Sequence, residues 1–233
     1  MSRIYTSIAT PEAQKQLNRL LESVGMPEEY KLAMTELGKL LAETVLSNFS
    51  EDISKPTIVV STAEDADFLQ CGVSTALKNH KINTKLAVFW NHHYQLPSKA
   101  SVAPVLHSFI EPNYEDVQNV IIVKSVMSGS CVVRTNLIAM LDKIANIDNI
   151  YILSPVAHKD SKKKLIKEFP EEISNKFNFV FFAEDDVKNE YGEVIPGIGG
   201  QIYSLLGLEN QPALTGYMPN VVKEITYNSL EFS

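Results

Sequence analysis

The sequence predicts an α/β fold in which a mostly parallel sheet is flanked by helices and preceded by a helical N-terminal region. Short runs of β-branched and apolar residues alternate along the chain with amphipathic segments of helical period. The runs lack polar alternation, which is typical of strands that are buried on both faces of a parallel sheet. Strands connected through helices in this way form βαβ units with right-handed crossovers.

The first fifty residues predict two helices. Thr10 and Pro11 suit the N-cap and the first turn of a helix that Gly25 ends. A longer helix is expected over residues 27–46, because leucines recur there on one face. The plain interpretation is two helices that pack in the fold without a further role.

Five buried strands are expected, and the third of them leads into a short loop of small residues. Ser128, Gly129, Ser130 and Cys131 form this loop, and an amphipathic helix follows it. Free backbone amides at a helix start can hold an anion, and ligands usually bind at the carboxyl ends of the strands. The ordinary alternative is a connection that binds nothing. The expected strands are residues 57–61, 84–90, 120–123, 149–154 and 177–183.

Three other segments have predicted structures but no predicted chemistry. A helix is expected from about residue 67 to 79, and residues 91–112 break the strand and helix alternation and suit a flap. His92 and His93 are expected to be exposed loop residues. The lysine-rich residues 160–176 predict a helix with a solvated, charge-balanced face.

Composition excludes several classes of protein. A net charge of −7 argues against general binding to nucleic acid or to an anionic membrane surface. The two cysteines, Cys71 and Cys131, make neither a disulfide framework nor a zinc motif. The N-terminus lacks the apolar core of a signal peptide, and no apolar run approaches the roughly 20 residues of a membrane helix. We therefore expect a cytoplasmic protein without a membrane segment.

A glycine-rich stretch near residue 200 predicts a loop rather than a core helix or a central strand. Such a stretch brings the backbone close to a neighbour or adopts positive φ. Apolar side chains among the glycines make a slot of the size of a base plausible, and a surface turn is the plain alternative. The candidate base-binding residues are Ile195, Gly197, Ile198, Gly199 and Gly200.

Five blocks of the sequence, in order, resemble the uracil phosphoribosyltransferases, which are type I phosphoribosyltransferases that form UMP and pyrophosphate from uracil and phosphoribosyl pyrophosphate. The most specific block is a DxxxNExG run from Asp185 followed by the IPGIG of residues 195–199. The resembling blocks are residues 16–21, 34–43, 121–131, 152–159 and 185–208.

The resemblance implies one domain over residues 1–208, with residues 91–112 and 185–203 as flap or hood segments and residues 209–233 as a C-terminal extension. It also implies a homodimer or higher oligomer, a small-molecule ligand and no tightly bound cofactor. By the resemblance, the small-residue loop holds the phosphate, the glycine-rich stretch holds the base, and the diphosphate loop corresponds to Thr62, Ala63, Glu64 and Asp65.

Several positions depart from the family pattern. Lys124 stands where the family has an acidic residue for the ribose hydroxyls, and Glu64 and Asp65 stand where it has an arginine. Two carboxylates repel a diphosphate unless a metal such as Mg²⁺ bridges them. The alternative is that both carboxylates simply face solvent. Lys124 is the candidate catalytic residue, as a cation or a nucleophile, and a solvent-facing lysine is the alternative.

Two functions therefore stay open. The first is transfer of a phosphoribosyl group to a pyrimidine-like base, with Mg²⁺ if a diphosphate is used. The second is a diverged nucleotide- or phosphate-binding homologue that acts as a sensor or a dimeric scaffold.

Overall fold

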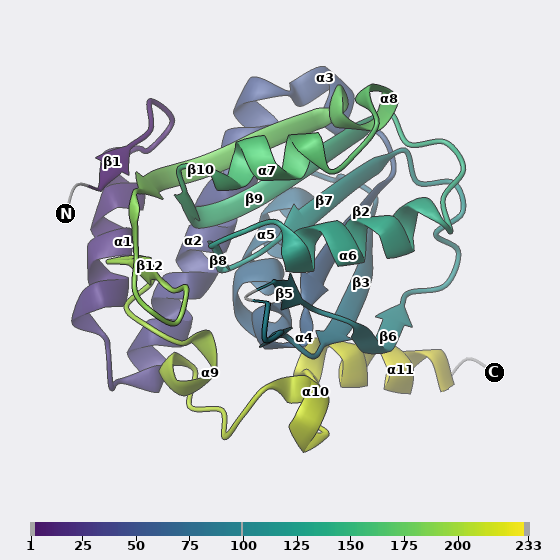
Figure 1. The fold of residues 1–233 in the computed structure, drawn as a ribbon. Helices are drawn as coiled ribbons and strands as arrows, with labels where there is room; N and C mark the ends of the chain where they lie inside the picture. Colours follow the sequence, from purple (N-terminus) through teal and green to yellow (C-terminus); the bar gives the residue numbers. More distant parts are fainter. Residues whose placement is uncertain (1–2, 99, 231–233) are drawn as a thin grey trace.

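A mixed sheet forms the centre of the molecule. The computed structural model describes residues 3–98 and 100–230, and within them the main sheet has eight strands (Figure 1). Five strands run parallel, and the antiparallel strands β1 (Ile4–Tyr5) and β6 (Val105–Ile110) close the two edges. The parallel strands are β2 (Thr57–Thr62), β3 (Thr84–Asn91), β7 (Asn119–Val123), β9 (Asn149–His158) and β10 (Phe177–Asp185). The predicted fold class is confirmed.

The order of the parallel strands fixes where a ligand can bind. Across the sheet it is β3, β2, β7, β9 and β10, so the direction of winding reverses between β2 and β7. In open α/β sheets, ligands bind outside the carboxyl ends of the strands at such a switch point. The residues after Thr62 and after Val123 therefore face the expected binding crevice.

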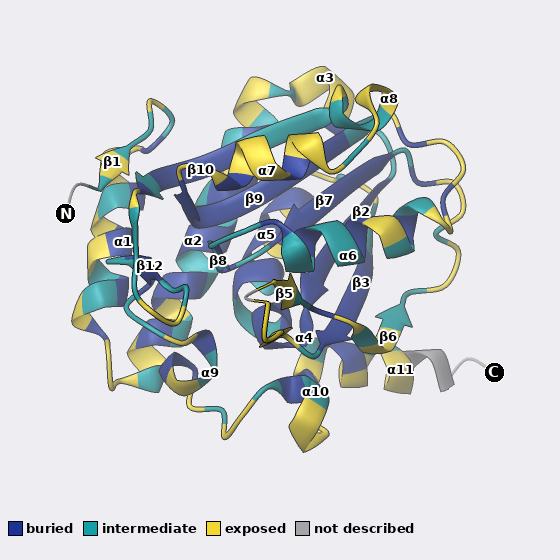
Figure 2. Ribbon diagram, viewed as in Figure 1, coloured by how far each residue is buried: buried dark blue, intermediate teal, exposed yellow. Residues whose placement is uncertain are grey.

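Helices cover both faces of the sheet, which explains why the strands are apolar without alternation. Helices α1 (Pro11–Glu22), α2 (Pro27–Asn48) and α5 (Cys71–Asn79) pack on one face. Helices α6 (Cys131–Leu141) and α7 (Ser161–Lys167) pack on the other. Val59 belongs to the first core and its neighbours Ile58 and Val60 to the second, as the two-residue period of a strand requires. Figure 2 shows the strands as the most deeply buried part.

Local sequence features explain how the N-terminal helices start and pack. The Thr10 hydroxyl accepts a hydrogen bond from the Ala13 amide at 3.2 Å, which confirms the predicted N-cap. Helices α2 and α5 approach closely because glycines meet at the crossing. A Cβ on Gly38 would lie 2.2 Å from the Leu69 carbonyl oxygen, and one on Gly72 would lie 2.1 Å from that of Thr35.

Two helix predictions are wrong in their bounds. The helix expected from about residue 67 already begins at Ala63: α4 (Ala63–Asp65), the π-helical turn η1 (Ala66–Gln70) and α5 follow β2 without a loop. The lysine-rich helix ends at Lys167, and α8 (Glu171–Ser174) begins only after Pro170. Proline has no backbone N–H and clashes with the preceding turn, so one continuous helix cannot form there. The second N-terminal helix runs to Asn48 and is followed by α3 (Ser50–Ile53).

Two small hairpins and the C-terminal helices complete the fold. Strands β4 (Tyr94–Gln95) and β5 (Ser101–Val102) form one hairpin, and β11 (Val187–Lys188) and β12 (Val194–Ile195) the other. After β12 come α9 (Ile202–Leu205), α10 (Pro212–Thr215) and α11 (Asn220–Leu230).

The C-terminal segment is fastened to the end of the sheet that carries β3. Asp67 accepts hydrogen bonds from the amides of Asn220 and Val221, both at 2.9 Å, and so caps the start of α11. The Trp90 indole donates to the Tyr217 carbonyl oxygen at 2.7 Å, and Val222 lies in the same small core as Trp90. Residues 209–230 therefore pack against the domain, beneath β3 in Figure 1.

Candidate functional site

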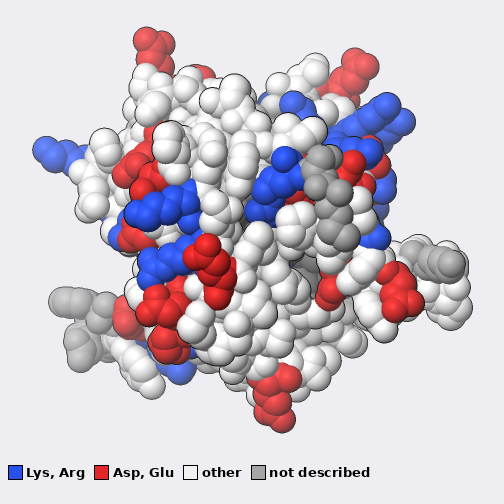
Figure 3. Space-filling view, turned by 90° about the vertical axis from the view of Figure 1, so that its left-hand side faces the viewer, with Lys and Arg blue, Asp and Glu red and all other residues white. Residues whose placement is uncertain are grey.

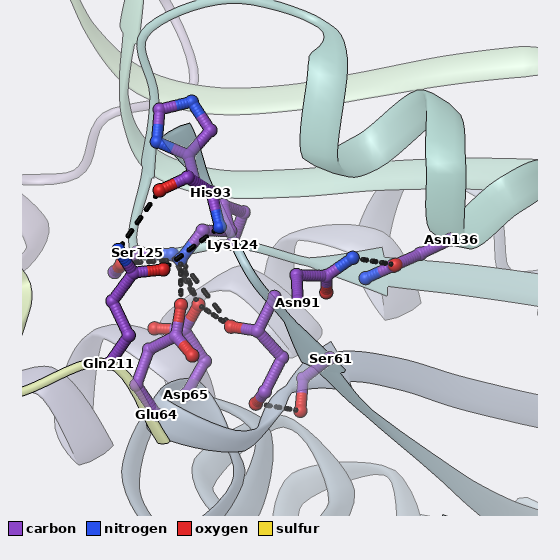
Figure 4. Close-up of polar contacts among 10 residues, drawn as sticks. Ser61, Glu64, Asp65, Asn91, His93, Lys124, Ser125, Asn136 and Gln211 are labelled. Carbon is purple, nitrogen blue, oxygen red and sulfur yellow. Dashed lines mark hydrogen bonds and ion pairs between the residues drawn. The ribbon is translucent and has the colours of Figure 1, made fainter. Parts of the chain in front are cut away.

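A buried lysine and two buried carboxylates occupy the switch point between β2 and β7. Lys124 follows β7, and its Nζ lies 2.6 Å from Asp65 Oδ2 and 3.1 Å from Glu64 Oε1 (Figure 4). The side chains of Lys124, Glu64 and Asp65 are only 12%, 6% and 1% exposed. The structure therefore contradicts a solvent-facing Lys124 and solvent-facing carboxylates.

Backbone and hydroxyl groups fix the Asp65 carboxylate in this position. The Thr62 hydroxyl donates to Asp65 Oδ2 at 3.0 Å, and the Ser125 amide donates to the same oxygen at 3.3 Å. Lys124 Nζ also lies 3.2 Å from the Ser125 hydroxyl. The ends of β2 and β7 thus hold one carboxylate oxygen between three donors, which makes the cluster rigid.

The cluster keeps its lysine protonated. Burial disfavours the ammonium, but the carboxylates of Asp65 and Glu64 outweigh burial and raise the pKa of Lys124. A protonated lysine has no lone pair, so this arrangement favours a cation over a nucleophile at Lys124. With both carboxylates ionised, the cluster carries a net charge of about −1. Nearby, burial and the Glu64 carboxylate raise the pKa of Tyr203, which stays a neutral phenol.

A cavity of about 780 Å³ opens above this cluster. Glu64 and Lys124 form part of its wall, and both hairpins contribute further residues, among them Gln95, Ser101 and Lys188. A volume of this size accommodates a nucleotide-sized small molecule. The strand ends and the two hairpins, which fall within the segments expected as flap or hood, thus line one cavity. Residues 105–110 of the first segment form the edge strand β6 instead.

The loop predicted to bind phosphate lies on the cavity wall over its whole length, from Ser128 to Cys131. Strand β8 (Val126–Met127) extends the line of β7 and pairs with β9, and α6 begins directly after the loop. The first amides of a helix have no partner within it and can bind an anion. A Cβ built on Gly129 would meet no atom within 4 Å, so the loop borders open space.

Cys131 also ties this loop to the β4–β5 hairpin. Its thiol donates to the Ser101 carbonyl oxygen at 3.2 Å. Burial raises the pKa of Cys131, so the side chain is a thiol rather than a thiolate at neutral pH. Its role here is to hold the loop.

The predicted base-binding stretch divides between the cavity and the protein interior. Ile198 and Gly200 line the cavity. Gly197 faces inward, because its amide donates to Asp185 Oδ2 at 2.9 Å and its carbonyl oxygen accepts from the Arg3 guanidinium. A Cβ on Gly199 would lie 2.8 Å from Val24 Cγ2. Ile195 pairs with Val187 in the hairpin and does not line the cavity.

The segment from Thr62 to Asp65, predicted as the diphosphate loop, is not a loop, and only part of it reaches the cavity. Ala63 begins α4 and is buried in the small core around Trp90. Thr62 and Asp65 lie beneath Lys124, and of these four residues only Glu64 lines the cavity. A diphosphate therefore has no open backbone loop at this strand end.

Sequence reasoning missed several side chains that line the cavity. Asn91, at the end of β3, donates to Asn136 Oδ1 at 2.8 Å, and the strand-end rule that selected Lys124 could have found it. His93 is the exposed loop residue that was expected, but it also lines the cavity, and desolvation, with neighbouring Lys124 and His92, lowers its pKa. Gln211 exchanges two hydrogen bonds with the His93 backbone, at 2.8 and 2.9 Å (Figure 4). No pattern in the sequence indicates that contact.

Three features that would indicate a metal, a nucleic acid or a membrane were sought in the described chain. Within residues 3–98 and 100–230, no group of three or more His, Cys, Asp or Glu side chains could hold a metal ion. On the face shown in Figure 3, basic and acidic side chains lie side by side, without an extended basic surface of the kind that binds nucleic acid. No helix of the described chain has the length and apolar content needed to span a bilayer.

Comparisons with known proteins identify the fold. No model of a known protein family matches the chain, and no curated protein sequence is similar to it. The structure of the AQ2163 protein from Aquifex aeolicus is similar with a TM-score of 0.65 and 17% identity, over 92% of this chain and 99% of that one. An adenine phosphoribosyltransferase from Leishmania donovani matches with a TM-score of 0.46 and 13% identity, over 69% of this chain and 71% of that one.

A hypoxanthine phosphoribosyltransferase from Staphylococcus aureus matches more distantly, with a TM-score of 0.41 and 9% identity, over 55% of this chain and 66% of that one. The likeness to the Aquifex protein extends over nearly the whole of both chains and concerns the fold. At such identities and TM-scores, none of these likenesses identifies the activity of this chain.

Proposed function

We propose that this protein binds a small phosphorylated ligand, with the phosphate on the loop from Ser128 to Cys131 and the rest of the molecule in the cavity. The observation that carries the proposal is the position of this loop. It lies at the carboxyl edge of the sheet, opens on a cavity of about 780 Å³ and leads into an eleven-residue helix. First-turn amides and an unobstructed Gly129 suit a phosphate group. Ile198 and Gly200 offer an apolar and backbone surface for the other end of the ligand.

The cluster of Lys124, Glu64 and Asp65 argues against a diphosphate at the switch point. Its net negative charge would face the diphosphate, and each contact of like charges at roughly 4 Å costs about 4 kcal/mol at an effective dielectric of about 20, before screening. Lys124 cannot offset this cost freely, because its ammonium already binds both carboxylates. A ligand that carries its phosphate only at the small-residue loop avoids the repulsion.

Transfer of a phosphoribosyl group to a pyrimidine-like base is the second candidate. The IPGIG motif favours it, since its Ile198 and the following Gly200 reach the same cavity as the small-residue loop. A diphosphate substrate would have to bring Mg²⁺ with it, because Glu64 and Asp65 are engaged by Lys124. A sensor or scaffold role and a homodimer are further predictions, and light scattering of the purified protein measures the oligomer.

Calorimetric titration with ribose 5-phosphate and with UMP tests the first proposal. We expect saturable binding to the wild type and at least a tenfold loss of affinity in Gly129→Asp, whose carboxylate would face the phosphate in open space. Asn146→Asp is the matched control, since it adds the same charge at an exposed loop position away from the cavity. Failure of both ligands to bind, or equal binding to both variants, contradicts the proposal. Formation of UMP from uracil, phosphoribosyl pyrophosphate and Mg²⁺ would favour the second candidate.

A further inference from the structure

Two lysines on the cavity wall have no role in the site described so far. Lys188 lies on β11 and is half-buried, and Lys164 lies on α7 and is exposed. Both line the cavity that contains the small-residue loop. Within the described chain, neither ammonium lies at ion-pair distance from a carboxylate, whereas the cavity's other two cations, Lys124 and Arg134, are each paired.

The surroundings of Lys188 are positive. Burial and the charge of Lys164 lower the pKa of Lys188, and Asp160 offsets this only in part. Burial and the charge of Lys188 in turn lower the pKa of His158, so that this imidazole is neutral at pH 7. Ammonium groups on the wall of one cavity repel each other, and an anion bound between them offsets the repulsion.

The carboxylates around this part of the cavity are occupied elsewhere or exposed. Glu168 pairs with Arg134 at 3.4 Å, and Glu193 accepts from the Asn189 amide group at 2.7 Å. The Asp160 side chain is 55% exposed and lies 3.8 Å from His158. Glu190, also on the wall, is exposed. None of them neutralises the lysine pair directly.

We propose that Lys164 and Lys188 form a second anion subsite, so that the natural ligand is a small molecule with two anionic groups. This inference rests on the proposed function, in which the loop from Ser128 to Cys131 holds the first group. The second group, a phosphate or a carboxylate, lies between the ammonium groups of α7 and β11. The hairpin that carries Lys188 also leads through β12 to Ile198, so one segment contacts both the second anion and the rest of the ligand.

Inorganic phosphate is a suitable probe, because it makes no assumption about the spacing of the two groups. Equilibrium dialysis with radiolabelled phosphate should give about two ions per chain for the wild type at saturation, one for each anion site. We expect about one ion for Lys188→Gln, about one for Gly129→Asp and none for the combined variant. Lys163→Gln is the matched control, as it removes an exposed lysine of the same helix that does not line the cavity, and it should still bind two.

The other results separate the failure of this inference from that of the proposed function. A single ion in the wild type that is lost in both Lys188→Gln and Gly129→Asp would mean one shared phosphate site, and it overturns the second subsite alone. Two ions that persist in Lys188→Gln also overturn it. No bound phosphate in the wild type overturns both the subsite and the proposed function. Thermal unfolding of each variant verifies that a lost ion does not reflect a lost fold.

Discussion

Replacing Lys124 by methionine tests whether the buried cluster is organised as described. Methionine matches the length and apolar stem of lysine but leaves Glu64 and Asp65 as two carboxylates without a cation, 6% and 1% exposed. Removing one partner of a buried ion pair typically costs about 3–5 kcal/mol, because the remaining charge stays buried. We therefore expect Lys124→Met to lower the free energy of unfolding by about 3–5 kcal/mol at pH 7.

Urea denaturation followed by circular dichroism measures this loss. Lys39→Met is the control, because the Lys39 and Glu36 side chains are 38% and 44% exposed and such surface pairs contribute little. The triple variant Lys124→Met, Glu64→Gln, Asp65→Asn removes all three charges and should recover much of the stability. A loss for Lys124→Met no larger than that of the control would refute a buried, charged cluster.

The pH dependence of the wild type has a definite sign. The carboxylates raise the folded-state pKa of Lys124 above its unfolded value of about 10.5. The stability from Lys124 is therefore complete below that pH and declines as pH rises through the folded-state pKa.

Two substitutions and one titration test local features of the structure. Thr10→Ala should lower the free energy of unfolding by about 1 kcal/mol in urea denaturation, because it removes the N-cap of α1, and no change would contradict that cap. Gly38→Ala should cost about 1–3 kcal/mol or more, since its Cβ would lie 2.2 Å from the Leu69 carbonyl oxygen, and a stabilised variant would show that α2 and α5 are further apart. An NMR titration of His93 should give a midpoint below 6.5, owing first to burial and then to the charges of Lys124 and His92, and a midpoint above 6.5 would contradict its position.

The layers of the fold and the place of the site follow from the sequence for clear reasons. Strands such as Ile58 to Val60 are apolar at every position because both faces of the sheet are covered, and that pattern is visible without a structure. The position of the small-residue loop was predictable as well. Small residues between a buried strand and an amphipathic helix must lie at the carboxyl edge of a parallel sheet, and the structure places Ser128 to Cys131 on the cavity wall.

Contacts between distant segments were not predictable from local patterns. Lys124 and Asp65 are 59 residues apart, and only the order of the strands places the ends of β2 and β7 side by side. Lys164 belongs to a lysine run that suits a solvated helix face, and Lys163 and Lys164 are both exposed, but only Lys164 also lines the cavity. What brings Lys164 to the cavity is the start of α7 at the carboxyl end of β9. Likewise, nothing near Gln211 indicates its hydrogen bonds to His93.

The central claim is that a phosphorylated ligand binds at the start of α6, and amide chemical shifts measure this most directly. A titration of ¹⁵N-labelled protein with ribose 5-phosphate should shift the amides of Ser128 to Cys131 in a saturable manner and leave those of Thr62 to Asp65 nearly unchanged. Saturable shifts confined to Thr62 to Asp65, or no shift at Ser128 to Cys131 at millimolar ligand, would contradict the claim.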